Sequence, residues 1–127
     1  MSKPTYLDMK NEEKMHEKIK NLSNYLDVNV FFGLKNLNDG FDYPSNQYFS
    51  NSDFYVIMQR CENLGIGIWG MESWLKQQKK INDIRYYESF KTFAFNPRWY
   101  FEAYQQLAAS NNELMFLATY YLPSHDI

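Results

Sequence analysis

The stretch that most constrains the fold is residues 52–75, where a helix pattern ends at a glycine and a strand pattern begins at once. Asn51 or Ser52 is expected to cap the helix, because short polar side chains accept hydrogen bonds from first-turn amides. Gly65 suits the left-handed position that ends a helix. The apolar helical face is expected at the positions i, i+3, i+4, i+7 and i+10, which are Phe54, Ile57, Met58, Cys61 and Leu64.

The run after Gly65 predicts a strand with both faces partly covered, since it is mostly apolar and contains β-branched and aromatic residues. Gly67 and Gly70 within it indicate a bulge or the close approach of another backbone. A helix that leads directly into a buried strand is half of a βαβ unit. From these patterns we expect a core that includes Ile57, Cys61, Ile68, Phe116 and Ala118.

Apolar spacing predicts further elements on both sides of this stretch. Residues 8–26 have helical spacing, whereas residues 28–34 alternate as a strand does. Residues 35–51 contain turn residues and predict a long loop. Residues 84–95 have a strand pattern and pair most simply with residues 66–75 as an antiparallel hairpin.

The C-terminal third predicts one more helix and one more strand. Asn96 is expected to cap that helix and Pro97 to occupy its first position. Residues 114–122 are apolar throughout, as in a central strand. Residues 1–7 are expected to form a loose arm, and residues 123–127 a frayed tail.

This order of elements predicts a single α/β (α+β) domain over residues 1–127. The expected architecture is a four-stranded mixed sheet of βαββαβ, ferredoxin-like order, preceded by an N-terminal amphipathic helix. The alternative is a mixed sheet in which sequential strands are neighbours and helices cover both faces.

Composition argues against several classes of protein. Aromatic residues make up 19% of the chain, which is too many for a disordered protein. Cys61 is the single cysteine, and no apolar run approaches 18 residues or forms a leader in MSKPTYLDMK, so we expect a cytoplasmic protein. Two histidines and one cysteine are too few for an ordinary zinc site, and the glycines of residues 65–70 lie in a strand pattern, so no metal or cofactor is expected.

Two alternatives to a protein-binding function remain open. Glu72 and Glu88 could face each other across the hairpin and do acid–base work in a small enzyme or regulator. A single-stranded nucleic-acid-binding module could stack bases on aromatic side chains. The basic side chains available for phosphates in that case are Lys76, Lys79, Lys80 and Arg85, although the pI of about 5.6 argues against this class.

Charge is unevenly distributed along the chain. Residues 27–75 carry six acids and two bases, a balance of −4, whereas residues 76–98 carry six bases and two acids, a balance of +4. The long loop combines acids with aromatic residues, a mixture that is common in protein interfaces. Its aromatic members are Phe41, Tyr43, Tyr48 and Phe49.

Three runs of the chain resemble the small immunity proteins of bacterial polymorphic-toxin and contact-dependent growth inhibition systems. The runs are NSDFYVIMQRCENLGIGIWGMESW, NPRWYFEAYQQL and ELMFLATYYLP, and the likeness spans about residues 28–122. Where that family commonly has a Gly-Gly-Asp-like cluster, this chain has Trp69-Gly70-Met71-Glu72. The resemblance implies a non-enzymatic cytoplasmic protein that binds one cognate toxin, often a basic nuclease, and covers its active site.

A basic toxin would be attracted by exposed acids and anchored by exposed tyrosines. We therefore expect the partner to bind either the loop or the hairpin. The candidate partner-binding residues are Asp39, Asp42, Tyr43, Tyr48, Asp53, Glu72 and Glu88.

Overall fold

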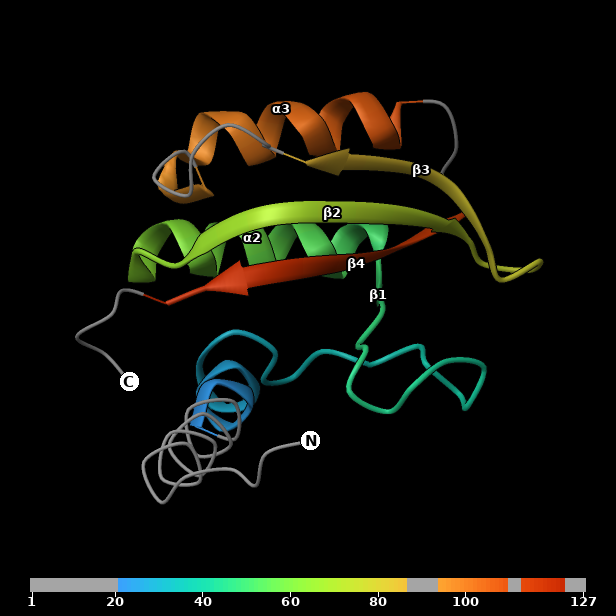
Figure 1. The fold of residues 1–127 in the computed structure, drawn as a ribbon, viewed down its shortest axis with the longest axis horizontal. Coiled ribbons are helices and arrows are strands. Elements are labelled where there is room, and N and C mark those ends of the chain that lie inside the picture. Colours follow the sequence, from blue (N-terminus) through green and yellow to red (C-terminus); the bar gives the residue numbers. More distant parts are fainter. Residues whose placement is uncertain (1–20, 87–93, 110–112, 123–127) are drawn as a thin grey trace, which may run out of the picture.

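The computed structural model describes residues 21–86, 94–109 and 113–122 (Figure 1). Residues 21–29 are helical and continue the expected N-terminal helix by three residues. The expected arm, residues 8–20, Glu88 and the expected tail lie outside the described residues. The remaining elements are β1 (Phe49–Ser50), α2 (Asn51–Leu64), β2 (Gly67–Leu75), β3 (Lys80–Tyr86), α3 (Pro97–Ala108) and β4 (Leu114–Tyr121).

The four strands form one sheet in the order β1-β4-β2-β3, and each neighbouring pair is antiparallel. The α+β class is therefore confirmed, whereas the expected mixed sheet with ferredoxin-like strand order is not. The antiparallel hairpin of β2 and β3 is confirmed, and β4 lies in the same sheet as predicted. Helix α2 connects β1 to β2, which have β4 between them, and α3 connects β3 to β4, which have β2 between them. The two crossover connections therefore interleave.

Helix α2 begins one residue earlier than expected. Ser50, not Asn51 or Ser52, is the N-cap: its backbone is extended and its Oγ accepts a hydrogen bond from the Asp53 amide at 3.2 Å. Ser50 can do this because it is also the last residue of β1, where extended backbone is already required. Gly65 ends the helix with φ +70°, as its position predicted.

The buried face of α2 packs on the sheet. Phe54 stacks on Phe116 of β4 with ring centroids 5.0 Å apart. Four of the five expected core residues are fully buried, whereas Ala118 is only partly buried. The prediction was wrong for Leu64, which is 40% exposed because the helix ends there, beyond the edge of the sheet contact.

The expected strand at residues 28–34 is wrong. The backbone stays helical through Asn29 and then turns, with the amides of Val30 and Phe31 both donating to the Leu26 carbonyl at 2.8 Å. Arg60 of α2 fixes the turn, since its Nη1 donates to the carbonyls of Val30 and Phe32 at 2.8 Å each. The first strand of the sheet is instead the two-residue β1.

The hairpin strand β3 begins before the expected position. It starts at Lys80, so the turn covers only residues 76–79. Residues 94 and 95 form a short 3₁₀ turn rather than strand, and residues 87–93 lie outside the described part. Helix α3 follows as predicted, with the Asn96 side chain accepting from the Arg98 amide at 3.1 Å and Pro97 in the first turn.

Both glycines of β2 occupy the special positions that were predicted. A Cβ on Gly67 would lie 3.1 Å from the carbonyl carbon and oxygen of Ala94, so another backbone does approach closely. The register between β2 and β4 shifts between Ile68 and Gly70, which is a bulge. Trp99 of α3 donates its indole N–H to the Ile68 carbonyl at 2.6 Å beside this bulge.

The two faces of the sheet have different covers. Phe116 touches Phe54 of α2 and Tyr104 of α3, so both helices lie on its face. Because side chains alternate along a strand, Trp74 and its cross-strand partner Met115 lie on the opposite face. Figure 1 shows the helix at residues 21–29 and the loop that follows it on the far side of β4 from α3.

Candidate functional site

The long loop packs against the hairpin, on the face of the sheet that α2 and α3 leave open. The rings of Phe41 and Tyr48 lie 5.7 and 5.2 Å from the Trp74 ring, and 4.8 Å from each other. The loop and the hairpin were alternative locations for the interface in the sequence. In the fold they form one continuous surface. The loop rings cover Trp74, a side chain that would have to be exposed in order to stack on a nucleic-acid base.

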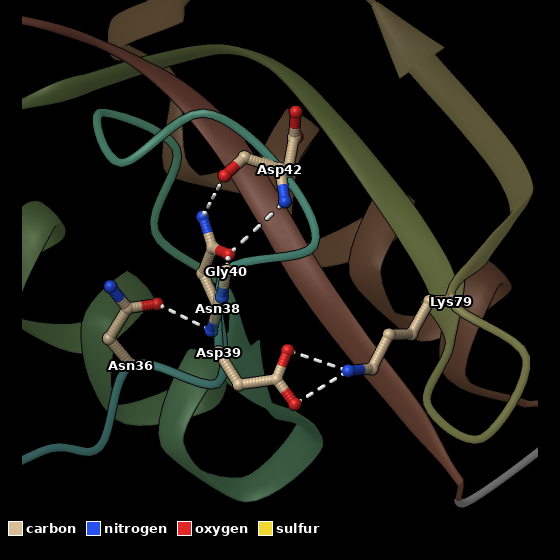
Figure 2. Close-up of polar contacts among 6 residues, drawn as sticks. All are labelled: Asn36, Asn38, Asp39, Gly40, Asp42 and Lys79. Atoms are coloured by element: carbon tan, nitrogen blue, oxygen red, sulfur yellow. Dashed lines mark hydrogen bonds and ion pairs between the residues drawn. The ribbon is translucent and has the colours of Figure 1, made fainter.

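An ion pair joins the loop to the turn of the hairpin. The Lys79 ammonium lies 2.6 and 2.5 Å from the two carboxylate oxygens of Asp39 (Figure 2). The same ammonium is 5.1 Å from the centre of the Phe41 ring. The hydrogen bond from Lys79 lowers the pKa of Asp39. Asp39 therefore contributes less attraction for a basic partner than a free acid would.

Two asparagine side chains fold the loop. Asn38 Oδ1 accepts from the amides of Gly40 and Asp42 at 3.1 and 3.3 Å (Figure 2). Its Nδ2 donates to the carbonyls of Tyr43 and Asn46 at 2.9 and 2.8 Å. Asn36 Oδ1 accepts from the Asn38 amide at 3.0 Å, and also from the amide of residue 48 at 3.0 Å. The loop is thus held by side-chain-to-backbone bonds in place of regular secondary structure.

Asp42 is a structural member of the loop as well as a surface acid. It accepts hydrogen bonds from the Tyr48 hydroxyl, from Asn46 Nδ2 at 3.0 Å and from the Tyr43 amide at 2.8 Å. These bonds, led by that from Tyr48, lower the pKa of Asp42. Tyr48 itself is fully buried, so its expected role as an exposed anchor is wrong. Trp74, far away in the sequence, supplies the surface that buries it.

Tyr43, unlike Tyr48, is largely exposed to solvent. Its side chain is 76% exposed, the largest exposure among the large hydrophobic residues that the structure describes. Its backbone is nevertheless fixed, because its amide donates to Asp42 and its carbonyl accepts from Asn38 Nδ2 and from the Asn46 amide at 2.9 Å. A partner that buried this ring would not have to order the backbone that carries it.

Glu72 lies on the same face of β2 as Trp74. It is half-buried, and burial raises its pKa; the charge of Asp42 acts in the same direction. The Trp74 indole opposes that shift, although its buried Nε1 makes no hydrogen bond of normal geometry. Glu72 stands opposite Ile84 in the hairpin register, and the carboxylate that influences its pKa among the described residues is Asp42. Its expected partner Glu88 lies outside the described residues.

The remaining candidates divide between this surface and the start of α2. Asp53 is half-buried in the first turn of α2, and no contact joins it to the loop acids within the described part of the chain. No sequence signal marked Ile81 and Ile84 as site residues, yet they are 40% and 36% exposed. They oppose Trp74 and Glu72 across the hairpin. The loop–hairpin surface is therefore defined as Asp39, Asp42, Tyr43, Glu72, Ile81 and Ile84.

Other chemistry has little support within residues 21–86, 94–109 and 113–122. No group of three or more His, Cys, Asp or Glu side chains there could hold a metal ion. Burial raises the pKa of the Cys61 thiol to about 12, so it is not a reactive thiolate. No helix among those residues has the length and hydrophobicity needed to cross a membrane. Comparison with protein-family models, curated proteins and solved structures found no match.

Proposed function

We propose that this chain is a cytoplasmic immunity protein of a bacterial polymorphic-toxin or contact-dependent growth inhibition system. In this proposal the loop–hairpin surface binds a cognate toxin domain and covers its active site, without chemistry of its own. The observation that carries the proposal is Tyr43, an exposed aromatic ring on a backbone that several hydrogen bonds already fix. Aromatic side chains of this kind dominate the binding energy of protein interfaces.

The composition of the surface supports a protein partner. Tyr43 belongs to the loop whose Phe41 and Tyr48 rings pack against Trp74 of the hairpin, and the half-buried acids Asp42 and Glu72 lie in the same loop and hairpin. Asp42 and Glu72 supply negative charge, whereas that of Asp39 is offset by Lys79. A basic partner such as a nuclease would be attracted by the first two acids. We further propose that the elements from Phe49 onwards represent the βαββαβ succession that the order of elements in the sequence predicted, with the N-terminal helix before it.

The direct test is binding to the toxin-like domain encoded beside the gene. Tyr43→Ala should accelerate dissociation by roughly 30-fold, the equivalent of about 2 kcal/mol for an interface hot spot. Tyr55→Ala is the matched control, because Tyr55 is 45% exposed on α2, away from the loop. Equal effects of the two changes would place the interface elsewhere. Failure of the neighbouring toxin domain to bind the wild-type protein would refute the immunity function.

Electrostatic attraction is tested separately. Glu72→Gln should slow association at low salt, and the difference should shrink as salt rises, because screening weakens attraction between exposed charges. Glu62→Gln is the control: it removes one exposed acid from α2 and keeps the same net charge as the first variant. If both changes slow association equally, net charge rather than the loop–hairpin surface guides the partner.

An enzyme with an acid–base carboxylate pair is the alternative, and one observation favours it. Glu72 has a raised pKa beside a second carboxylate, Asp42, and such perturbed acids are common at active sites. In that case the pair would be Asp42 and Glu72. The survival of cells that express the toxin domain distinguishes an immunity protein from an enzyme. An immunity protein with Glu72→Gln, when highly expressed, would still protect these cells.

A further inference from the structure

One peptide bond of the long loop has the sequence that favours a spontaneous rearrangement of the backbone. Asp39 is followed by Gly40, and no other aspartate of the chain precedes a glycine. The amide nitrogen after an aspartate can attack the side-chain carboxyl group and form a five-membered succinimide ring. A side chain on the following residue hinders this attack, and glycine has none.

Both reacting groups lie where water can reach them. The Asp39 side chain is 64% exposed. Gly40 has φ +103°, and a Cβ placed on it would meet no atom within 4 Å. A succinimide ring therefore has room to form on the surface of the loop, and water has access to hydrolyse it.

The folded loop holds the two reacting atoms in different directions, as Figure 2 shows. The Asp39 carboxylate is paired with the Lys79 ammonium at 2.6 and 2.5 Å, whereas the Gly40 amide donates to Asn38 Oδ1 at 3.1 Å. The attack requires the carboxyl group to turn from Lys79 toward the Gly40 nitrogen, and that amide to leave Asn38. Exposed ion pairs are weak, so the first of these contacts opens readily.

Lys79 also affects the reactivity of the carboxyl group. The hydrogen bond from its ammonium lowers the pKa of Asp39, so the carboxyl group stays ionised. The succinimide forms from the protonated acid, because a hydroxyl group can leave as water and an ionised oxygen cannot. Loss of the Lys79 ammonium would therefore raise the reactive fraction of Asp39 and free its side chain to rotate.

We propose that Asp39–Gly40 is a site of spontaneous isomerisation to isoaspartate and that Lys79 controls its rate. The Gly40 nitrogen bonds to Asp39 Cγ, the C–OH bond breaks, and the hydroxyl group leaves with the amide proton as water. Water then adds to the backbone carbonyl carbon of Asp39 and breaks its bond to nitrogen, so that the main chain passes through Cγ. The water lost is regained, and the mass is unchanged. The site does not depend on the immunity function.

Isomerisation would change the backbone that carries Tyr43. It adds one carbon atom to the main chain between Asn38 and Gly40. Asn38 Oδ1 accepts from the amides of Gly40 and Asp42 at 3.1 and 3.3 Å, and a longer main chain would disturb this spacing. The Nδ2 of the same asparagine donates to the Tyr43 carbonyl at 2.9 Å. The isomerised loop would therefore hold Tyr43 less firmly.

The test incubates the full chain at mildly acidic pH and follows residue 39 by peptide mapping with electron-transfer dissociation, which distinguishes isoaspartate from aspartate. Lys79→Met should accelerate isoaspartate formation at least about threefold, because it removes an exposed ion pair of ordinary strength. Lys79→Arg keeps the pair and should react at nearly the wild-type rate. A blocked peptide of residues 36–42 should react faster than the folded wild-type protein.

Asp39→Glu is the chemical control, because it keeps the carboxylate but would require a six-membered ring, so it should form no isomer. Deamidation of a neighbouring asparagine is distinguished by its increase in mass. The proposal is overturned if no isoaspartate forms at residue 39 of the folded protein, if Lys79→Met and Lys79→Arg react at equal rates, or if the wild-type protein reacts as fast as the peptide.

Discussion

The ammonium of Lys79 lies within 2.6 Å of both carboxylate oxygens of Asp39, a residue 40 positions earlier in the chain. The pair joins the acidic loop to the basic hairpin, which are the two segments of opposite charge in the sequence. Lys79 also has φ +50°, and it is the one non-glycine residue with positive φ in the part of the chain that the structure describes. Glycine or asparagine would occupy such a turn position with less strain.

Replacing Lys79 by glycine should separate turn strain from loop attachment. The free energy of unfolding should change by less than about 1 kcal/mol, because relief of the positive φ offsets the loss of an exposed ion pair. Hydrogen exchange in residues 36–48 should nevertheless become faster, since the loop loses its ion pair with the hairpin. Lys79→Arg should keep exchange slow. Unchanged exchange in the glycine variant would show that the ring packing and the hydrogen bonds within the loop hold it without the ion pair.

Truncation of the α2 face should distinguish its buried and exposed apolar residues. Ile57 has no exposed surface, so Ile57→Ala should lower the free energy of unfolding by about 2–5 kcal/mol. Leu64→Ala, on the same predicted stripe but 40% exposed, should lower it by less than about 1 kcal/mol. Urea denaturation of both variants measures the difference. Similar losses would mean that α2 continues to bury its face up to its last residue.

Gly67 should tolerate no side chain. A methyl group there would meet the backbone of Ala94 at 3.1 Å, and backbone cannot rotate away as a side chain can. Gly67→Ala should therefore lower the free energy of unfolding by about 1–3 kcal/mol, as overpacking does. Thermal melts provide the measurement. A neutral result would indicate that the 3₁₀ turn at residues 94–95 shifts freely.

Glu72 should make stability depend on pH. Burial raises its pKa above the ordinary value of 4.5, so the folded protein holds the proton more tightly than the unfolded chain. Its contribution to stability is therefore present at low pH and is lost as pH rises from about 4.5 through the folded-state pKa. Glu72→Gln should be stabilised relative to wild type at pH 7 and less so at pH 4, in denaturant melts at each pH.

The stability of Glu72→Gln must be compared with that of the wild type at each pH, because the loop acids change stability with pH in the opposite direction. Asp39 and Asp42 have lowered pKa values, so their stabilising contributions are lost as pH falls below about 3.8. Glu62→Gln controls for the loss of one carboxylate charge. A difference between Glu72→Gln and wild type that stays constant from pH 4 to pH 7 would contradict the raised pKa.

Elements held by local interactions can be predicted from the sequence, whereas those held by distant residues cannot. The segment from α2 to β2 was predicted well because helical spacing, Gly65 and the glycines of β2 act locally. The strand at residues 28–34 was not predicted well, because the helix continues through Asn29 and the turn after it is held by Arg60, which is distant in the sequence. Val28 and Phe32 belong to the alternating set but are 69% and 55% exposed, whereas Val30 is buried. Strand order also escaped prediction, since pairing of distant strands leaves no local pattern.

The candidate site shows the same limit. Tyr43 and Tyr48 both lie among the acids of one loop, and nothing local separates their roles. The difference arises from Trp74, which packs on one ring and not on the other. The sequence shows the loop acids only as a group, whereas the ion pair of Asp39 and the hydrogen bonds of Asp42 depend on residues brought together by the fold.

The position of β4 has a consequence for the order in which the protein can be made. Of the four strands that the structure describes, β4 leaves the ribosome last, yet it lies between β1 and β2. Until it emerges, β1 has no partner in the sheet, and Phe54 has no Phe116 to stack on. Domains emerge at about 5–20 residues per second, so the nascent chain exposes these apolar surfaces for several seconds. A message truncated before Leu114 would yield a hairpin and helices without the strand that unites them.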